Sequence, residues 1–191
     1  MTEGRSVWSV GVCAVLVLGA ALACKKGGSE ASGSSTSGSS GSSPSTTAAA
    51  RLAYPGTADG LKSLLETEFT KSDTKATVAA LMPSDADYGA VFTSEAADKV
   101  KANTAKLLAS PPESLGKSGD AVIVAAASVD DLKAGTGDAE KCPGGYKKMA
   151  DSIKPGTTLY CTKVGSISYD AFAHVNGHWA WFPKAFRALR E

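Results

Sequence analysis

Two histidines and one aspartate near the C-terminal end are of types that could transfer protons or bind a metal ion. His174 and His178 are four residues apart, and on a helix this spacing would turn both imidazoles toward one zinc ion. The Asn176-Gly177 pair between them favours a two-residue β-turn instead. In the resulting hairpin the two histidines point to opposite faces of the sheet. We therefore expect no metal site, and we interpret His178 as a packed or rim residue.

His174 is the better candidate for chemistry, because the hairpin register places it on the same face as Asp170. An aspartate and a histidine on an aromatic wall are groups that proton transfer in a pocket would need. The two residues are four apart on one strand, however, which separates them by about 13 Å at roughly 3.3 Å per residue. We expect no catalytic dyad. A small pocket enzyme that uses either His174 or Asp170 as a general base stays as the alternative function.

Other short motifs of catalysis or cofactor binding are incomplete. Gly135-Thr136-Gly137 is followed by Glu140 where a dinucleotide-binding motif has its third glycine. Gly165-Ser166 lacks the closing glycine of a nucleophile elbow. The carboxylates between residues 130 and 140 do not have the spacing of a calcium loop. We therefore expect no cofactor, and binding is favoured over catalysis.

The elements that position these residues are predicted by two consecutive hairpin signals. Strands are expected over residues 157–164, 167–175 and 178–183. Gly165-Ser166 suits a type II′ turn and Asn176-Gly177 suits a type I′ turn. An earlier buried strand is expected over residues 120–127, where β-branched side chains stand between turn residues.

Strict alternation along these hairpins predicts two different faces. One face is mostly apolar, with alanines where a helix could approach closely, and is assigned to the helices. The other has three aromatic side chains within a polar rim. It is either a groove or a second, smaller core under the segment from residue 129 to 156. The candidate ligand-binding residues on this face are Asp170, Phe172, His174, Trp179 and Trp181.

The chain before Pro111 is predicted to be helical. One apolar stripe is expected on a helix from about residue 59 to 71, with Asp59 as its N-cap. A second short helix follows Ser72 or Asp73. Ser84 and Asp87 then resemble a capping box ahead of further apolar residues. A third helix begins near residue 93. The predicted fold class is α+β, with N-terminal helices packed on one face of a C-terminal antiparallel meander sheet.

The first residues have the order of an export signal. A weakly basic start that includes Arg5 precedes an apolar segment over residues 7–23, which Lys25 and Lys26 end abruptly. We expect a signal peptide over residues 1–23.

The run Ala20-Ala21-Leu22-Ala23-Cys24 resembles the lipobox of bacterial lipoprotein precursors, although leucine is commoner than alanine at the position of Ala21. The resemblance implies cleavage before Cys24, a diacylglycerol on its thiol, and attachment of the mature lipoprotein to the membrane through acyl chains such as palmitate. An uncleaved signal anchor is the second interpretation, because the apolar run is only a little shorter than the roughly 20 residues that span a bilayer. Lys25 favours the outer membrane over the inner membrane, since retention at the inner membrane is associated with aspartate at that position.

Residues 24–50 are expected to be a lipidated cysteine followed by a disordered Gly/Ser tether, because such a composition cannot bury enough apolar area to order its backbone. Residues 51–191 then form one α+β domain. The chain has 20 basic and 19 acidic residues, of which 17 and 17 lie in that domain. A neutral domain has no basic field for nucleic acid. The expected partners are the membrane and an unknown envelope protein or small ligand.

The domain contains two of the four cysteines, Cys142 and Cys161. An exported protein with two remaining cysteines usually pairs them. The rival interpretations are a redox dithiol or a metal pair, but a C-x-x-C spacing and nearby histidines are both missing. We expect a structural disulfide.

The order of helices followed by a twisted antiparallel sheet resembles the cystatin-like cone of nuclear transport factor two-like domains. In that superfamily the last long strands form the wall of a pocket. The resemblance covers about residues 53–187 and is carried by the order of elements, so it implies a fold and a place for a pocket. It implies no particular activity, because the superfamily includes both enzymes and binding modules.

Overall fold

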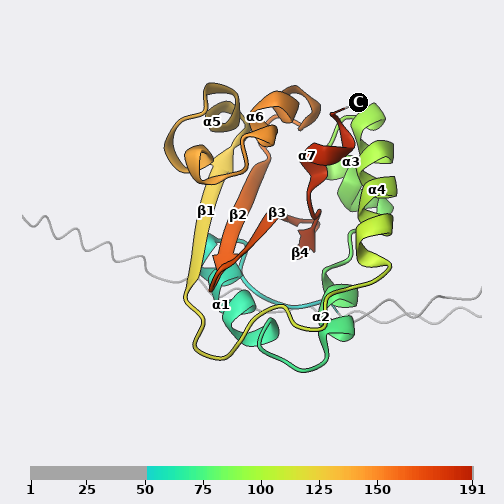
Figure 1. The fold of residues 1–191 in the computed structure, drawn as a ribbon. Helices are drawn as coiled ribbons and strands as arrows, with labels where there is room; N and C mark the ends of the chain where they lie inside the picture. Colours follow the sequence, from blue (N-terminus) through green and yellow to red (C-terminus); the bar gives the residue numbers. More distant parts are fainter. Residues whose placement is uncertain (1–50, 191) are drawn as a thin grey trace, which may run out of the picture. The chain divides into compact units, whose positions relative to one another are not determined.

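The structure of the protein is a computed structural model, which describes residues 51–190 (Figure 1). Four helices come first and are named here by their bounds: α1 (Ala58–Glu68), α2 (Thr74–Leu81), α3 (Asp85–Val91) and α4 (Ser94–Leu108). Strand β1 (Val122–Ser128) leads into α5 (Val129–Ala134), the 3₁₀ helix η1 (Gly137–Lys141), α6 (Gly145–Met149) and the 3₁₀ helix η2 (Ala150–Ser152). Strands β2 (Thr158–Val164), β3 (Ile167–Val175) and β4 (His178–Trp181) follow, and α7 (Ala185–Ala188) comes last. The α+β class, with helices first and an antiparallel meander last, is confirmed.

Side-chain caps determine where the first helices begin. The Thr57 hydroxyl accepts a hydrogen bond from the backbone of Gly60 and starts α1, so the N-cap expected at Asp59 is wrong by two residues. The Asp73 carboxylate caps α2 as expected. The predicted capping box is also present, since the Asp87 carboxylate accepts from the backbone of Ser84 at 2.7 Å and the Ser84 hydroxyl accepts in return. None of the helices in residues 51–190 is long and apolar enough to cross a membrane.

The four strands pair in chain order, β1-β2-β3-β4, and every pair is antiparallel. Val164 pairs with Ile167, and Val175 pairs with His178, as the two hairpin signals predict. Asn176 and Gly177 both have a positive φ, which a type I′ turn requires. The turn residues thus set the register of both hairpins at their closed ends.

A β-bulge in β3 changes which side chains share a face. Tyr160 pairs with Phe172 and Thr162 pairs with Tyr169, so two steps along β2 match three along β3. Ala171 lies in the longer stretch and has a φ of 59°, which is uncommon for a residue with a side chain. The uninterrupted alternation expected along this hairpin is therefore wrong beyond the bulge, because Phe172 moves to the face that carries Tyr160.

Side chains from both faces of the sheet are buried, in two separate clusters. The first cluster joins one face of the sheet to α1 and α2, and its sheet members are Val122, Tyr160, Val164, Tyr169, Phe172, Trp179 and Trp181. The second cluster joins the opposite face to α3, the first half of α4 and the helices α5 to α7, and its strand members are Ala127, Leu159, Cys161, Ala171, Ala173 and Ala180. Figure 1 shows α5 and α6 near one end of β1 and β2, with α7 beside α4. The helices thus cover parts of both faces.

Candidate functional site

The three aromatic residues proposed as a ligand-binding wall are buried. Phe172, Trp179 and Trp181 have exposed fractions of 0%, 1% and 6%. Phe172 stacks on Trp181 with ring centroids 5.6 Å apart. Each tryptophan also has a partner for its N–H, which donates to a backbone carbonyl at 3.0 or 3.1 Å. The open groove is therefore a wrong expectation for these three residues: they form a core, and it packs against α1 and α2 rather than under residues 129–156.

His174 is half-buried and lies beside this core. Its ring packs edge-on against Trp179, with centroids 5.2 Å apart. It also lines a cleft of 370 Å³ together with Gly56, Tyr160 and the residues that precede β2. A Cβ at position 56 would lie 2.4 Å from Nδ1 of His174, so glycine is needed there for the imidazole to fit. The lining of this cleft includes no carboxylate that could orient the ring.

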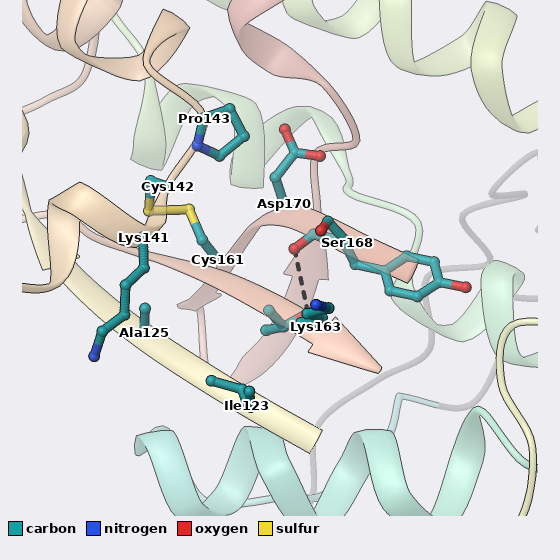
Figure 2. Close-up of a pocket in the computed structure, with 11 residues that line it drawn as sticks. Ile123, Ala125, Lys141, Cys142, Pro143, Cys161, Lys163, Ser168 and Asp170 are labelled. Carbon is teal, nitrogen blue, oxygen red and sulfur yellow. Dashed lines mark hydrogen bonds between the residues drawn. A yellow bond between two sulfur atoms is a disulfide. The ribbon is translucent and has the colours of Figure 1, made fainter. Parts of the chain in front are cut away.

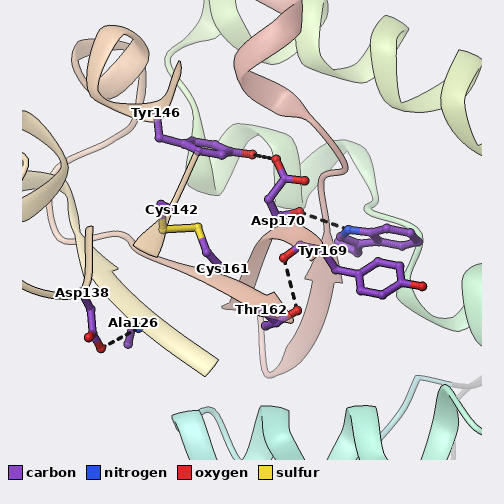
Figure 3. Close-up of a disulfide and its surroundings, with 9 residues drawn as sticks. Ala126, Asp138, Cys142, Tyr146, Cys161, Thr162, Tyr169 and Asp170 are labelled. Carbon is purple, nitrogen blue, oxygen red and sulfur yellow. Dashed lines mark hydrogen bonds between the residues drawn. A yellow bond between two sulfur atoms is a disulfide. The ribbon is translucent and has the colours of Figure 1, made fainter. Parts of the chain in front are cut away.

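Asp170 belongs to a different environment, on the opposite face of the sheet. Asp170 is 3% exposed, and its carboxylate accepts a hydrogen bond from the Tyr146 hydroxyl at 2.7 Å (Figure 3). The Lys184 ammonium lies 3.8 Å from the other carboxylate oxygen. Burial, with a further contribution from the charge of Asp170, raises the pKa of the Tyr146 hydroxyl well above its ordinary value. Tyr146 therefore stays protonated and remains the donor.

The structure does not bring His174 and Asp170 together. They line separate clefts, and the bulge at Ala171 lies between them in the chain. Each would have to act without the other in any proton transfer. Within residues 51–190, no group of three His, Cys, Asp or Glu side chains is placed to hold a metal ion.

A cleft of 510 Å³ lies on the face of the sheet that carries Asp170, and we call it the sheet-face cleft (Figure 2). Its floor comes from β1, β2 and β3, and its wall comes from the segment between η1 and α6. The sheet contributes Ile123, Ala125, Cys161, Thr162, Lys163, Ser168, Tyr169 and Asp170, and the wall contributes Lys141, Cys142 and Pro143. Its lining is mainly apolar, and its polar side chains include the exposed Lys163 and Ser168 and the buried Asp170.

The disulfide between Cys142 and Cys161, which the sequence predicts, forms the junction of wall and floor. The two Cα atoms are 5.4 Å apart and the residues are 19 apart in the chain. The bond attaches the wall segment to the middle of β2, and Figure 3 shows it beside the Tyr146–Asp170 pair. The wall of the cleft is therefore held by a covalent bond and by a buried hydrogen bond.

Three cleft residues were missed in the sequence and have clear chemical characters. Ile123 is 55% exposed, the most exposed of the large apolar side chains in residues 51–190. Lys163 is exposed on the floor, whereas the Lys141 ammonium at the wall is already paired with Asp138 at 2.7 Å. The sequence signal that could have found them is the spacing of two residues between Ile123 and Ala125 in β1 and between Cys161 and Lys163 in β2. It predicts one shared face, but not that the face is open.

Cys24, the proposed lipidation residue, lies outside the described residues. No family model, no curated protein and no solved structure matches this chain. The resemblances to bacterial lipoprotein precursors and to nuclear transport factor two-like domains therefore stay predictions from the sequence.

Proposed function

We propose that this protein is a bacterial envelope lipoprotein, anchored by acyl chains on Cys24, whose domain binds an envelope partner or a small ligand without turning it over. The observation that carries the binding function is the sheet-face cleft. It combines the exposed Ile123, the exposed ammonium group of Lys163, which has no ion pair among residues 51–190, and a wall fixed by the disulfide. A site with rigid walls loses little entropy when it is occupied, which favours binding.

The anchor is supported by the sequence alone. The small residues before Cys24, the lysines after it and the Gly/Ser-rich stretch up to residue 50 have one common explanation in a lipidated, tethered domain. Two or three acyl chains give stable attachment, because each buried CH₂ contributes about 0.8 kcal/mol. Lys25 after the cysteine favours the outer membrane.

Binding is favoured over catalysis by the state of the two candidate bases. The Asp170 carboxylate is occupied by Tyr146 and lies near Lys184, so little of its hydrogen-bonding capacity is left for a substrate. His174 packs against Trp179 and Gly56 in another cleft. A pocket enzyme that uses His174 or Asp170 as general base is the alternative. It would be refuted by turnover that survives replacement of each residue by alanine.

The binding function is tested by photo-crosslinking in the native envelope. A photo-crosslinking amino acid at position 123 should give a discrete adduct, whereas the same probe at Leu107, which is 38% exposed on α4, should not. Ser168→Trp, which fills the cleft from β3, should remove the adduct. Melting shifts with peptidoglycan fragments, lipids and envelope extracts would then identify the ligand. Equal labelling at both positions, or an adduct that persists in the Ser168→Trp variant, would refute a site at this cleft.

A further inference from the structure

We infer that the sheet-face cleft takes an amphipathic anion, a single acidic group on an apolar body, with the acidic group at Lys163 and the apolar body toward the disulfide. This inference rests on the proposed binding function and adds the class of ligand. It also predicts the orientation of the ligand.

The charge of the cleft determines the sign of the charge that its ligand should have. Of the three charged groups that line it, two are compensated. Lys141 is paired with Asp138 at 2.7 Å, and Asp170 accepts from Tyr146 at 2.7 Å with Lys184 nearby. Lys163 has no ion pair with any described residue. The uncompensated charge in the cleft is therefore one positive charge at the exposed end of the floor.

A charge-assisted hydrogen bond to such a group is stronger than a neutral one. The Ser168 hydroxyl lies on the neighbouring strand, since Lys163 and Ser168 are directly paired across the β2–β3 hairpin. A carboxylate or phosphate at this point would have an ammonium group and a hydroxyl as donors. Both are exposed, so the acidic group would stay partly hydrated.

The other end of the cleft suits an apolar body. It is formed by Ala125, the disulfide and Pro143. The exposed Ile123, which pairs with Lys163 across β1 and β2, adds apolar surface to the floor. An acidic group placed against this apolar lining would lose its hydration, which is unfavourable. The ligand therefore has one favourable orientation in the cleft, with its acidic group at Lys163.

The size of the cleft limits the ligand. Its volume of 510 Å³ equals about 17 water molecules at about 30 Å³ each. A medium-length acyl chain with its acidic group fits this space, and decanoate is a suitable probe. An alkyl phosphate of the same length distinguishes carboxylate from phosphate as the acidic group.

The test uses the full chain in nanodiscs and a decanoate analogue with a diazirine at the end of its alkyl chain. Illumination should label the wall near Cys142 and Pro143 or the floor at Ala125, as mapped by mass spectrometry. Lys163→Gln should reduce labelling about tenfold, which corresponds to about 1.4 kcal/mol, because a charge-assisted hydrogen bond is replaced by a weaker neutral one. Lys163→Arg should retain it. The matched control is Lys106→Gln, an exposed lysine on α4 that has no ion pair with a described residue.

The same diazirine on an alkyl phosphate and on neutral decanol completes the experiment. Labelling of the cleft by one acidic probe and not by decanol supports the inference and names the acidic group. Equal labelling by decanol, or labelling that Lys163→Gln leaves unchanged, would overturn it. If no acidic probe labels the cleft while the crosslink at Ile123 still forms, the ligand class is wrong and the binding function stands. If both fail, the binding function falls too.

Discussion

The imidazole Nε2 of His178 lies 3.1 Å from Oδ2 of Asp87, and this contact joins the first residue of β4 to α3 across 91 residues of chain. Asp87 is fully buried. Its other oxygen accepts from the Asn176 amide at 2.7 Å, and its Oδ2 also accepts from the backbone and hydroxyl of Ser84. One carboxylate thus caps α3 and holds the turn between β3 and β4.

Asp87 gives the domain an acid-sensitive contribution to stability. Burial by itself raises the pKa of this carboxyl. Hydrogen bonds from the Ser84 backbone, Asn176 and the Ser84 hydroxyl, together with the charge of His178, outweigh burial and leave the pKa below its ordinary value. A group whose pKa is lower in the folded state stabilises the fold above its unfolded pKa of about 3.9. This stabilisation is lost as the pH falls through the lowered folded value.

We predict that Asp87→Asn lowers the free energy of unfolding by about 2 kcal/mol near neutral pH, because hydrogen bonds to a buried charge are lost. The difference from wild type should shrink as the pH falls below about 4. Urea unfolding at a series of pH values measures it. Asp98→Asn on the exposed surface of α4 is the control and should follow wild type. A gap between Asp87→Asn and wild type that stays constant into strong acid would contradict the assignment.

The disulfide should stabilise the domain through its closed loop. Replacing Cys142 and Cys161 together by alanine should lower the free energy of unfolding by roughly 3 kcal/mol, the chain-entropy value for a loop of about this length. Urea unfolding of the double variant measures the loss, and wild type under reducing conditions should lose a similar amount. An unchanged midpoint with an unchanged m-value would show that the bond contributes nothing.

The β-bulge predicts that two buried alanines of β3 respond differently to replacement by glycine. Ala171 has a φ of 59°, whereas Ala173 is paired with Ala180 in the regular ladder. Glycine removes backbone strain at position 171. At position 173 it only increases the conformational entropy of the unfolded chain, which destabilises the fold. Ala173→Gly should therefore cost about 1 to 2 kcal/mol more than Ala171→Gly in unfolding free energy. Equal costs in denaturant titrations would mean that Ala171 is not strained.

The parts of the fold that depend on local chemistry were predictable, and the faces of the sheet were not. Asn176-Gly177 needs positive φ at both positions, and Ser84 with Asp87 forms a recognisable cap, so both local structures follow from short sequences. The bulge occurs at Ala171, and alanine gives no sign of a positive φ. One extra residue reverses the alternation after it, which is why the sequence predicts Trp179 and Trp181 on the face of Asp170, whereas they lie on the face of Tyr160 in the core against α1 and α2.

Location is a separate prediction, because it depends on the residue after the anchor and not on the domain. In a host with two membranes the protein should fractionate with the outer membrane. Lys25→Asp should move it toward the inner membrane if the sorting rule of well-known Gram-negative lipoproteins applies. Density-gradient fractionation measures this, and wild type among the inner-membrane markers would refute the outer-membrane proposal. A Gram-positive host would keep the protein on the outer face of its one membrane.

Replacing Cys24 by serine should abolish lipidation, because a serine hydroxyl does not substitute for the thiol that the acyl-transfer enzyme uses. The melting temperature should be nearly unchanged, since both core clusters and the disulfide lie within residues 51–190. Labelled fatty-acid incorporation and membrane fractionation of wild type and variant test this together. Loss of the label with the variant still in the membrane would mean that residues 7–23 act as an uncleaved anchor. That result would replace the lipoprotein interpretation and leave the sheet-face cleft, whose chemistry depends on Lys163 and Ile123, unaffected.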